Sequence, residues 1–148
     1  MNYNTRLMNE KDILDVLDVG NLSLREAWTL ESLKKELQNP LAKYIVISSD
    51  SKVIAFAGLW IVAGEGQITN IAVHPNCRGK GLGNKLMEAL INNMNTWNCN
   101  SLTLEVRNSN IIAKKLYSKY GFIEEGIRKN YYHNDDGTKE DAIIMWLR

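Results

Sequence analysis

The sequence predicts a mixed α/β domain in which a mostly antiparallel sheet carries helices on both faces. Its strand-like segments are rich in β-branched residues or alternate strictly between apolar and polar residues. Its helix-like segments have apolar residues at helical spacing. Three consecutive strand segments stand between two helices and a glycine-rich turn, which excludes a regular strand–helix repeat. The 148 residues are enough for one domain with a real core, and we expect a single domain over residues 1–148.

The N-terminal part predicts a short strand followed by two helices. Residues 3–8 form the strand, and Asn9 can cap a helix over residues 11–19 that ends at Gly20-Asn21. A second helix over residues 30–38 follows. The apolar face of the first helix is expected to consist of Ile13, Leu14, Val16 and Leu17. The second helix has Thr29 as its cap and an apolar face of Leu30, Leu33 and Leu37.

The rest of the chain alternates between strands and helices. The predicted strands are residues 43–48, 53–62, 67–74, 101–107, 122–128 and 141–147. A helix follows the glycine-rich turn and reaches about residue 95, and another covers residues 111–119. The apolar stripe of that last helix is Ile112, Ala113, Leu116, Tyr117 and Tyr120. Alternation in residues 101–107 places Glu105 and Arg107 on the face opposite the apolar side chains.

The glycine-rich turn has the features of an anion site. Pro75 ends the preceding strand because it has no N–H to donate. Arg78 and Lys80 supply positive charge, and the following helix points free N–H groups back into the turn. Its glycines are Gly79, Gly81 and Gly83. The turn lacks the Ser or Thr after Lys80 of a mononucleotide loop and the parallel strand setting of a dinucleotide fingerprint, so a phosphate of another carrier is expected.

Charge, hydropathy and cysteine content exclude several classes of protein. A net charge of +1 gives no field for nucleic acid, and no apolar run approaches the ~20 residues of a membrane span. Without a signal-peptide pattern, and with only Cys77 and Cys99, the expected location is a reducing cytoplasm. His74 and His133 have no metal-ligand spacing with the cysteines, so no metal is expected. Nothing indicates an oligomeric state.

Residues 78–83 match the pattern [RQ]-x-x-G-x-[GA]. This is the pyrophosphate loop of the GNAT superfamily of N-acetyltransferases, which the chain therefore resembles. Within it, an ordered series is similar to the bacterial ribosomal-protein-alanine N-acetyltransferases (RimI type). The series is Leu104-Glu105-Val106-Arg107, Asn110, Ala113, Leu116-Tyr117, Gly121-Phe122, Gly126, Arg128, Tyr131-Tyr132 and Glu140-Asp141-Ala142. The resemblance implies the GNAT fold and acetyl-CoA as acetyl donor.

The same resemblance implies where the cofactor binds. Backbone groups of the strand before the loop hold the pantetheine arm and stabilise the oxyanion if the strand end splays from its neighbour. The loop holds the pyrophosphate. The implied cofactor-binding residues are Ile71, Ala72, Val73, Arg78, Gly79, Lys80, Gly81, Leu82, Gly83, Asn110 and Tyr117.

Two residues are candidates for acid–base catalysis. An α-amine has a pKa of ~7.7–8 and needs only modest help to lose its proton, which Glu105 could take directly or through water. The alternative for Glu105 is a solvated carboxylate on a strand face. Tyr117 lies two helical turns after Asn110 and, by the resemblance, protonates the leaving thiolate. Its position on an apolar stripe suits a core tyrosine equally well.

The acceptor is less clearly encoded. Trp28 is either a core anchor or part of a site wall, and residues 28–40 resemble the tryptophan-bearing helical segment of the subfamily. Tyr131 and Tyr132 fall in the segment that, by resemblance, lines the acceptor groove. Gln67 stands where relatives often carry an ionisable residue and cannot act as a base. We expect transfer to a protein N-terminal amine, such as alanine of a ribosomal protein. A small amine, a lysine side chain, or a non-catalytic acyl-CoA-binding module are the alternatives.

Overall fold

The computed structural model describes residues 2–24 and 28–148, which form a seven-stranded sheet in the order β1-β2-β3-β4-β5-β7-β6. The strands are β1 (Asn4–Leu7), β2 (Ala42–Ser49), β3 (Lys52–Val62), β4 (Glu65–Val73), β5 (Ser101–Arg107), β6 (Ile123–His133) and β7 (Lys139–Leu147). The helices are α1 (Ile13–Ser23), α2 (Leu30–Leu37), α3 (Leu82–Asn92) and α4 (Ile111–Lys119). Neighbouring strands are antiparallel except β4 and β5, which confirms the predicted mixed fold.

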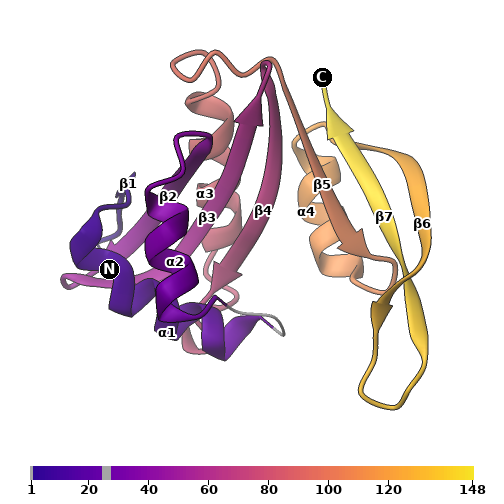
Figure 1. The fold of residues 1–148 in the computed structure, drawn as a ribbon, viewed down its shortest axis with the longest axis horizontal. Coiled ribbons are helices and arrows are strands. Elements are labelled where there is room, and N and C mark those ends of the chain that lie inside the picture. Colours follow the sequence, from indigo (N-terminus) through magenta and orange to yellow (C-terminus); the bar gives the residue numbers. More distant parts are fainter. Residues whose placement is uncertain (1, 25–27) are drawn as a thin grey trace.

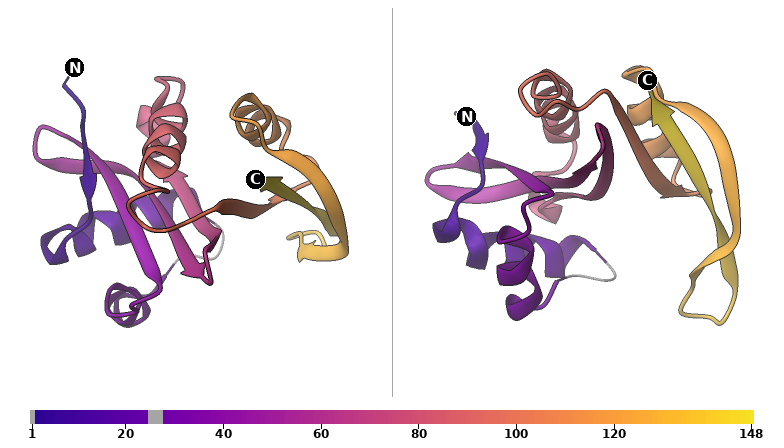
Figure 2. Two further views of the ribbon diagram at one scale, coloured as in Figure 1. Left: turned by 90° about the horizontal axis from the view of Figure 1, so that it is seen from above. Right: turned by 45° about the horizontal axis from the view of Figure 1, so that its top comes forward.

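Helices cover both faces of the sheet, as predicted. Figures 1 and 2 show α1 and α2 on one face and α3 and α4 on the other. Each face has its own apolar core, because alternate side chains of β2 and β3 point to opposite sides. Ile45 and Ile47 pack with the buried residues of α3, whereas Val46 and Phe56 pack with those of α1 and α2.

Three helical faces differ from the prediction. The helix α1 runs past Gly20 to Ser23, because the Gly20 carbonyl accepts the Leu24 N–H at 2.8 Å, and its buried residues are Val16, Val19 and Gly20. Leu14 falls off this stripe and is 70% exposed. In α2 Leu33 is buried as predicted, whereas Leu30 is 39% exposed. In α4 the predicted stripe is right except for Ile112, which is 86% exposed.

Two element boundaries also differ. The helix α3 ends at Asn92, and hydrogen-bonded turns continue the chain beyond it. The strand β6 extends to His133 rather than stopping at residue 128. Its pairing with β7 is interrupted between Arg128 and Tyr132, where Asn130 takes a positive φ of 55° and its N–H donates to Asp141. The predicted strand therefore ends where this bulge interrupts the ladder, and the pairing resumes beyond it at Tyr132.

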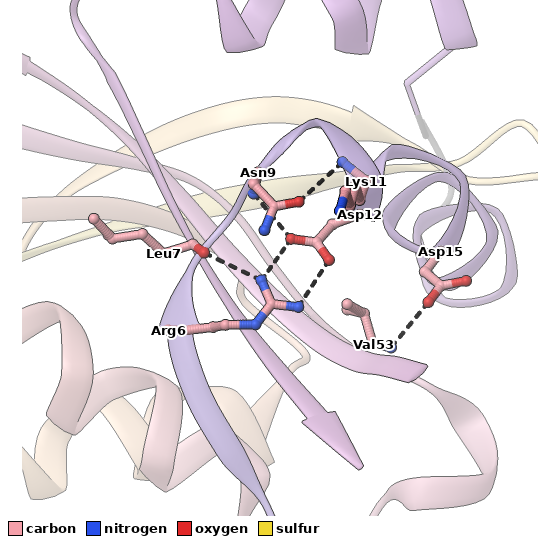
Figure 3. A network of polar contacts seen from close by, with 7 residues as sticks. All are labelled: Arg6, Leu7, Asn9, Lys11, Asp12, Asp15 and Val53. Carbon is pink, nitrogen blue, oxygen red and sulfur yellow. Dashed lines mark hydrogen bonds and ion pairs between the residues drawn. The ribbon is translucent and has the colours of Figure 1, made fainter. Parts of the chain in front are cut away.

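An ion pair fixes the edge strand β1 to the start of α1. Arg6 donates two hydrogen bonds to the buried Asp12 carboxylate, at 2.7 and 2.9 Å, and the Asn9 N–H donates a third at 2.9 Å (Figure 3). One turn further along, Asp15 accepts the Val53 N–H at 3.0 Å and ties α1 to β3. The hydrogen bonds from Arg6 hold the pKa of Asp12 below its usual value. In the part of the chain described, no helix is both long and apolar enough to cross a membrane.

We predict that Asp12→Asn lowers the free energy of unfolding by about 2 kcal/mol at pH 7, because a charged acceptor of three hydrogen bonds is lost. A carboxylate whose folded-state pKa is lowered stabilises the protein above its unfolded pKa of about 3.9, and that stability disappears as the pH falls through the folded-state pKa. The difference between wild type and variant should therefore shrink on acidification.

Urea unfolding at several pH values measures this effect. Asp18→Asn, on the exposed side of the same helix, is the matched control and should change stability by less than about 0.5 kcal/mol. A deficit of Asp12→Asn that stays constant from pH 7 to below the folded-state pKa of Asp12 would contradict the assignment.

Candidate functional site

A cavity of about 860 Å³ opens where β4 and β5 separate. The parallel pairing of these strands covers only Glu65–Gln67 against Ser101–Thr103. Beyond it, β4 stays with β3 and β5 stays with β7, and the two arms of the sheet diverge (Figure 1). The cavity is lined by Ser23, Leu24, Gln67, Ile68, Thr69, Asn70, Ile71, Leu104, Glu105, Val106, Arg107, Asn110, Tyr117, Tyr131, Tyr132 and His133.

A β-bulge marks the point of divergence on β4. Ile68 pairs with Leu59 and Asn70 with Gly58, so Thr69 is the extra residue. Of the backbone groups proposed for the cofactor arm, Ile71 borders the cavity. The Ala72 side chain is buried in the core under α1 and α2, and the Val73 carbonyl accepts a hydrogen bond from the Ser23 hydroxyl at 2.9 Å. Without β5 beside it, this end of β4 turns every second N–H and C=O toward the opening.

Glu105 points from β5 into the cavity. Alternate residues of β5 are buried, and Glu105 lies on the other face with 19% of its side chain exposed. Its Oε1 lies 3.1 Å from Nε of Arg128 on β6. Arg128 in turn stands over the ring of Tyr131, 5.7 Å from its centroid. The candidate base is therefore held by an arginine to which the sequence assigns no role.

Tyr117 reaches the same cavity from α4. Burial, and secondarily the nearby Tyr132 phenol, raise the pKa of Tyr117 to about 12. Its ring packs against Phe122, with centroids 5.9 Å apart. The phenol is thus both part of the packed interface and a proton donor that stays protonated at neutral pH. Its packing agrees with a core tyrosine, and its place at the cavity wall leaves the acid role a prediction.

Asn110 lies at the start of α4. Its side-chain oxygen accepts the Ala113 N–H at 3.1 Å, so it caps the helix, and it borders the cavity as well. The sequence spacing correctly predicts that Asn110 and Tyr117 face the same way.

The β6–β7 hairpin forms the opposite wall. Tyr131 and Tyr132 pack edge to face, with centroids 5.0 Å apart, and both line the cavity. The Arg107 guanidinium lies 4.4 Å from the Tyr132 ring centroid and donates to Glu140 at 3.2 Å. Glu140 also accepts the Ser109 N–H at 2.7 Å, and the hydrogen bonds from Ser109, with a smaller contribution from Arg107, hold the pKa of Glu140 below its usual value. Burial, and then the charge of Glu105, raise the pKa of Tyr132, which keeps this phenol neutral too.

The glycine-rich turn lies at the beginning of α3. Gly79 and Gly81 have φ values of 76° and 77°, and a Cβ on either would meet no atom within 4 Å. They are therefore required by backbone conformation, and the space beside them is open. Gly83 has another reason, since a Cβ there would lie 3.1 Å from Leu116 of α4. Arg78 and Lys80 are exposed, whereas the Leu82 side chain is buried and leaves only its N–H to a ligand.

These features fit a phosphate group. The first N–H groups of α3 have no partner one turn earlier in the helix, and they point into a turn that has open space and two cations. Elsewhere, residues 2–24 and 28–148 contain no group of three His, Cys, Asp or Glu side chains placed to hold a metal ion.

Two predicted acceptor residues occupy different positions. Gln67 lines the cavity at the last point where β4 pairs with β5. Trp28 packs against the core under α1 and α2, as its core reading requires. With the Asn70 amide oriented so that its oxygen faces the indole, Trp28 Nε1 donates to it at 3.1 Å. Trp28 therefore contacts Asn70, which lines the cavity and which the sequence gives no reason to select.

Known proteins resemble this chain over nearly its whole length. The sequence profile of the acetyltransferase (GNAT) family matches residues 13–122. A relative from Bacillus subtilis is 43% identical over 143 residues, which cover 96% of this chain and 93% of the relative. The [ribosomal protein bS18]-alanine N-acetyltransferase of Haemophilus ducreyi is 37% identical over 140 residues, which cover 93% and 94%. The crystal structure of the ribosomal-protein-S18-alanine N-acetyltransferase from Escherichia coli has a TM-score of 0.91 at 33% identity, covering 99% of this chain and 93% of that one.

Proposed function

The chain belongs to the acetyltransferase (GNAT) family and is an N-acetyltransferase, and from this premise we propose that it acetylates the N-terminal alanine of ribosomal protein bS18, using acetyl-CoA. One observation carries the proposal: relatives that align with this chain almost end to end bear that activity in their names. The cavity supports it, because a carboxylate from β5 and a protonated phenol from α4 border the same opening.

In the proposed mechanism, acetyl-CoA supplies a thioester whose acetyl group the amine attacks directly. Glu105 takes the proton of the acceptor amine, directly or through a water molecule. Backbone N–H groups of Ile71–Val73 donate to the oxygen on which negative charge develops. Tyr117 donates its phenolic proton to the departing sulfur. Because the pKa of Tyr117 is about 12, this acid remains loaded throughout the pH range of an ordinary assay.

Binding is divided between two parts of the chain. Arg78, Lys80 and the N–H groups of residues 79–83 would hold the pyrophosphate, with Asn110 on the cofactor arm. Tyr131, Tyr132 and Gln67 would contact the acceptor, with Trp28 supporting that side. A ribosomal protein as acceptor places the reaction in the cytoplasm, where Cys77 and Cys99 stay reduced; both are free cysteines.

An acceptor screen tests the proposed function. The purified protein is given acetyl-CoA and either a peptide with a free N-terminal alanine, the same peptide with a blocked N-terminus and an internal lysine, or a panel of small amines. Thiol release and mass spectrometry report transfer. We expect the free alanine peptide to be preferred. Preference for the lysine peptide or for a small amine would overturn the proposed identity of the acceptor. Tight binding of acetyl-CoA with no release of its thiol in the presence of any amine would indicate a binding module.

The turn is tested by a pair of glycine substitutions. Gly81→Ala forces an alanine into a positive φ, which costs about 1–2 kcal/mol and shifts the N–H groups of the turn. We expect acetyl-CoA affinity, measured by calorimetry, to fall by about tenfold or more.

Gly137→Ala is the matched control for that measurement. Gly137 has a φ of 88° and no neighbour within 4 Å, and it lies at the tip of the β6–β7 hairpin. It should lose similar stability and keep its affinity for acetyl-CoA. Equal affinities for the two variants would remove the turn from the cofactor site.

The base is tested by Glu105→Gln. The amide keeps the size of the side chain but cannot take a proton at neutral pH, so turnover should fall by more than about tenfold while acetyl-CoA affinity holds. Glu65→Gln, an exposed carboxylate at the start of β4, is the control and should turn over as wild type does. An unchanged rate for Glu105→Gln would exclude it from the mechanism.

A further inference from the structure

Glu36 is a buried carboxylate that the proposed mechanism does not use. It lies on α2 with only 5% of its surface exposed. Three neutral donors surround it: Trp60 Nε1 at 2.9 Å, the Tyr44 hydroxyl at 3.3 Å and Asn39 Nδ2 at 3.3 Å. Burying a carboxylate is costly unless its hydrogen bonds are satisfied, so these donors are what allows Glu36 to remain here.

Tyr44 connects Glu36 to β4. Its ring lies directly over Gly58, where a Cβ would come within 2.4 Å of a ring carbon. Burial and the neighbouring charge of Glu36 raise the pKa of Tyr44, so its hydroxyl stays a donor. Gly58, under the ring, pairs with Asn70 of β4, and the side chains of Thr69 and Asn70 lie near enough to the hydroxyl to offset part of the rise in its pKa. Tyr44 therefore lies between Glu36 on α2 and the bulge of β4 that borders the cavity.

The Thr69–Asn70 bulge needs such support. It lies beyond the last paired residue of β5, so β3 is its only neighbouring strand. The Thr69 hydroxyl donates to the Gly58 carbonyl at 3.2 Å, and the Asn70 amide accepts from Trp28 and donates to the Thr69 carbonyl at 3.2 Å. The Asn70 side-chain oxygen has two lone pairs, and Trp28 uses one of them, so the other can accept a hydrogen bond from a ligand.

We propose that Glu36 and Tyr44 are positioning residues that hold the Thr69–Asn70 bulge in place, so that Asn70 hydrogen-bonds the main chain of the acceptor peptide. This inference rests on the proposed function. Asn70 and the next residue, Ile71, both border the cavity beside the proposed reaction centre. A group bound by Asn70 therefore lies next to the reacting amine and away from the pyrophosphate turn at the start of α3.

Tyr44→Phe tests the proposal with little risk to folding, because the ring over Gly58 is kept and only the hydroxyl is removed. We expect the KM for the acceptor to rise about tenfold, with the KM for acetyl-CoA and kcat within about twofold of wild type. Asn70→Ala should show the same pattern. Glu36→Gln alone should also raise the KM for the acceptor. In the double variant with Tyr44→Phe, it should raise that KM little further, because the two residues act through one contact.

Glu31→Gln is the matched control. Glu31 lies on the same helix with 84% of its side chain exposed and 3.9 Å from Lys35 Nζ, and its substitution should leave both KM values unchanged. The proposal is overturned if folded Tyr44→Phe and Asn70→Ala keep the wild-type acceptor KM, or if both KM values rise together. Wild-type turnover on the alanine peptide is measured first. Should the screen find a different amine, the same KM comparison is made with it, so a wrong acceptor and a wrong positioning role give different results.

Discussion

The separation of β4 from β5 is the constraint on which the site depends. Only three residues of each strand pair, and the bulge at Thr69 turns β4 away just beyond them. That geometry leaves backbone groups of β4 without a strand partner, gives Glu105 an open space to face, and lets Tyr117 approach from α4. A fully paired sheet would fill the same volume with ladder hydrogen bonds and contain no cavity.

Charge in this cavity is local and paired. Arg128 lies against Glu105, and Arg107 is fixed between Glu140 and the Tyr132 ring. The two cavity tyrosines with raised pKa values, Tyr117 and Tyr132, remain neutral. The site thus combines the Glu105 carboxylate with phenols that can donate, although the whole chain has a net charge of only +1. Such an arrangement suits proton transfer better than the attraction of a highly charged polymer.

Local signals in the sequence were sufficient for most of the fold. Alternation in β5 and the cap at Thr29 depend on neighbouring residues, and the structure has them as predicted. The exposed Leu14 was misjudged because the stripe of α1 is set by what it packs against. The contacts of Arg128 with Glu105 and of Asn70 with Trp28 were missed for a related reason. Arg128 belongs to the series that carries the resemblance, but no local pattern indicates a partner for either residue, because the partners are distant in the sequence.

The same distinction separates the donor side of the site from the acceptor side. The turn after β4 is a contiguous segment whose glycines, cations and helix start can be recognised as a pattern. The proposed acceptor side is formed by β4 and the β6–β7 hairpin, with α2 and β2 behind it, and contacts between distant parts of the chain support it, such as Trp60 with Glu36 and Arg107 with Tyr132. In our proposal, a substitution at Tyr44 or Glu36 alters this side without touching the turn before α3. The proposal therefore implies that acceptor preference can change while the cofactor motif stays intact, through the buried contacts behind the cavity.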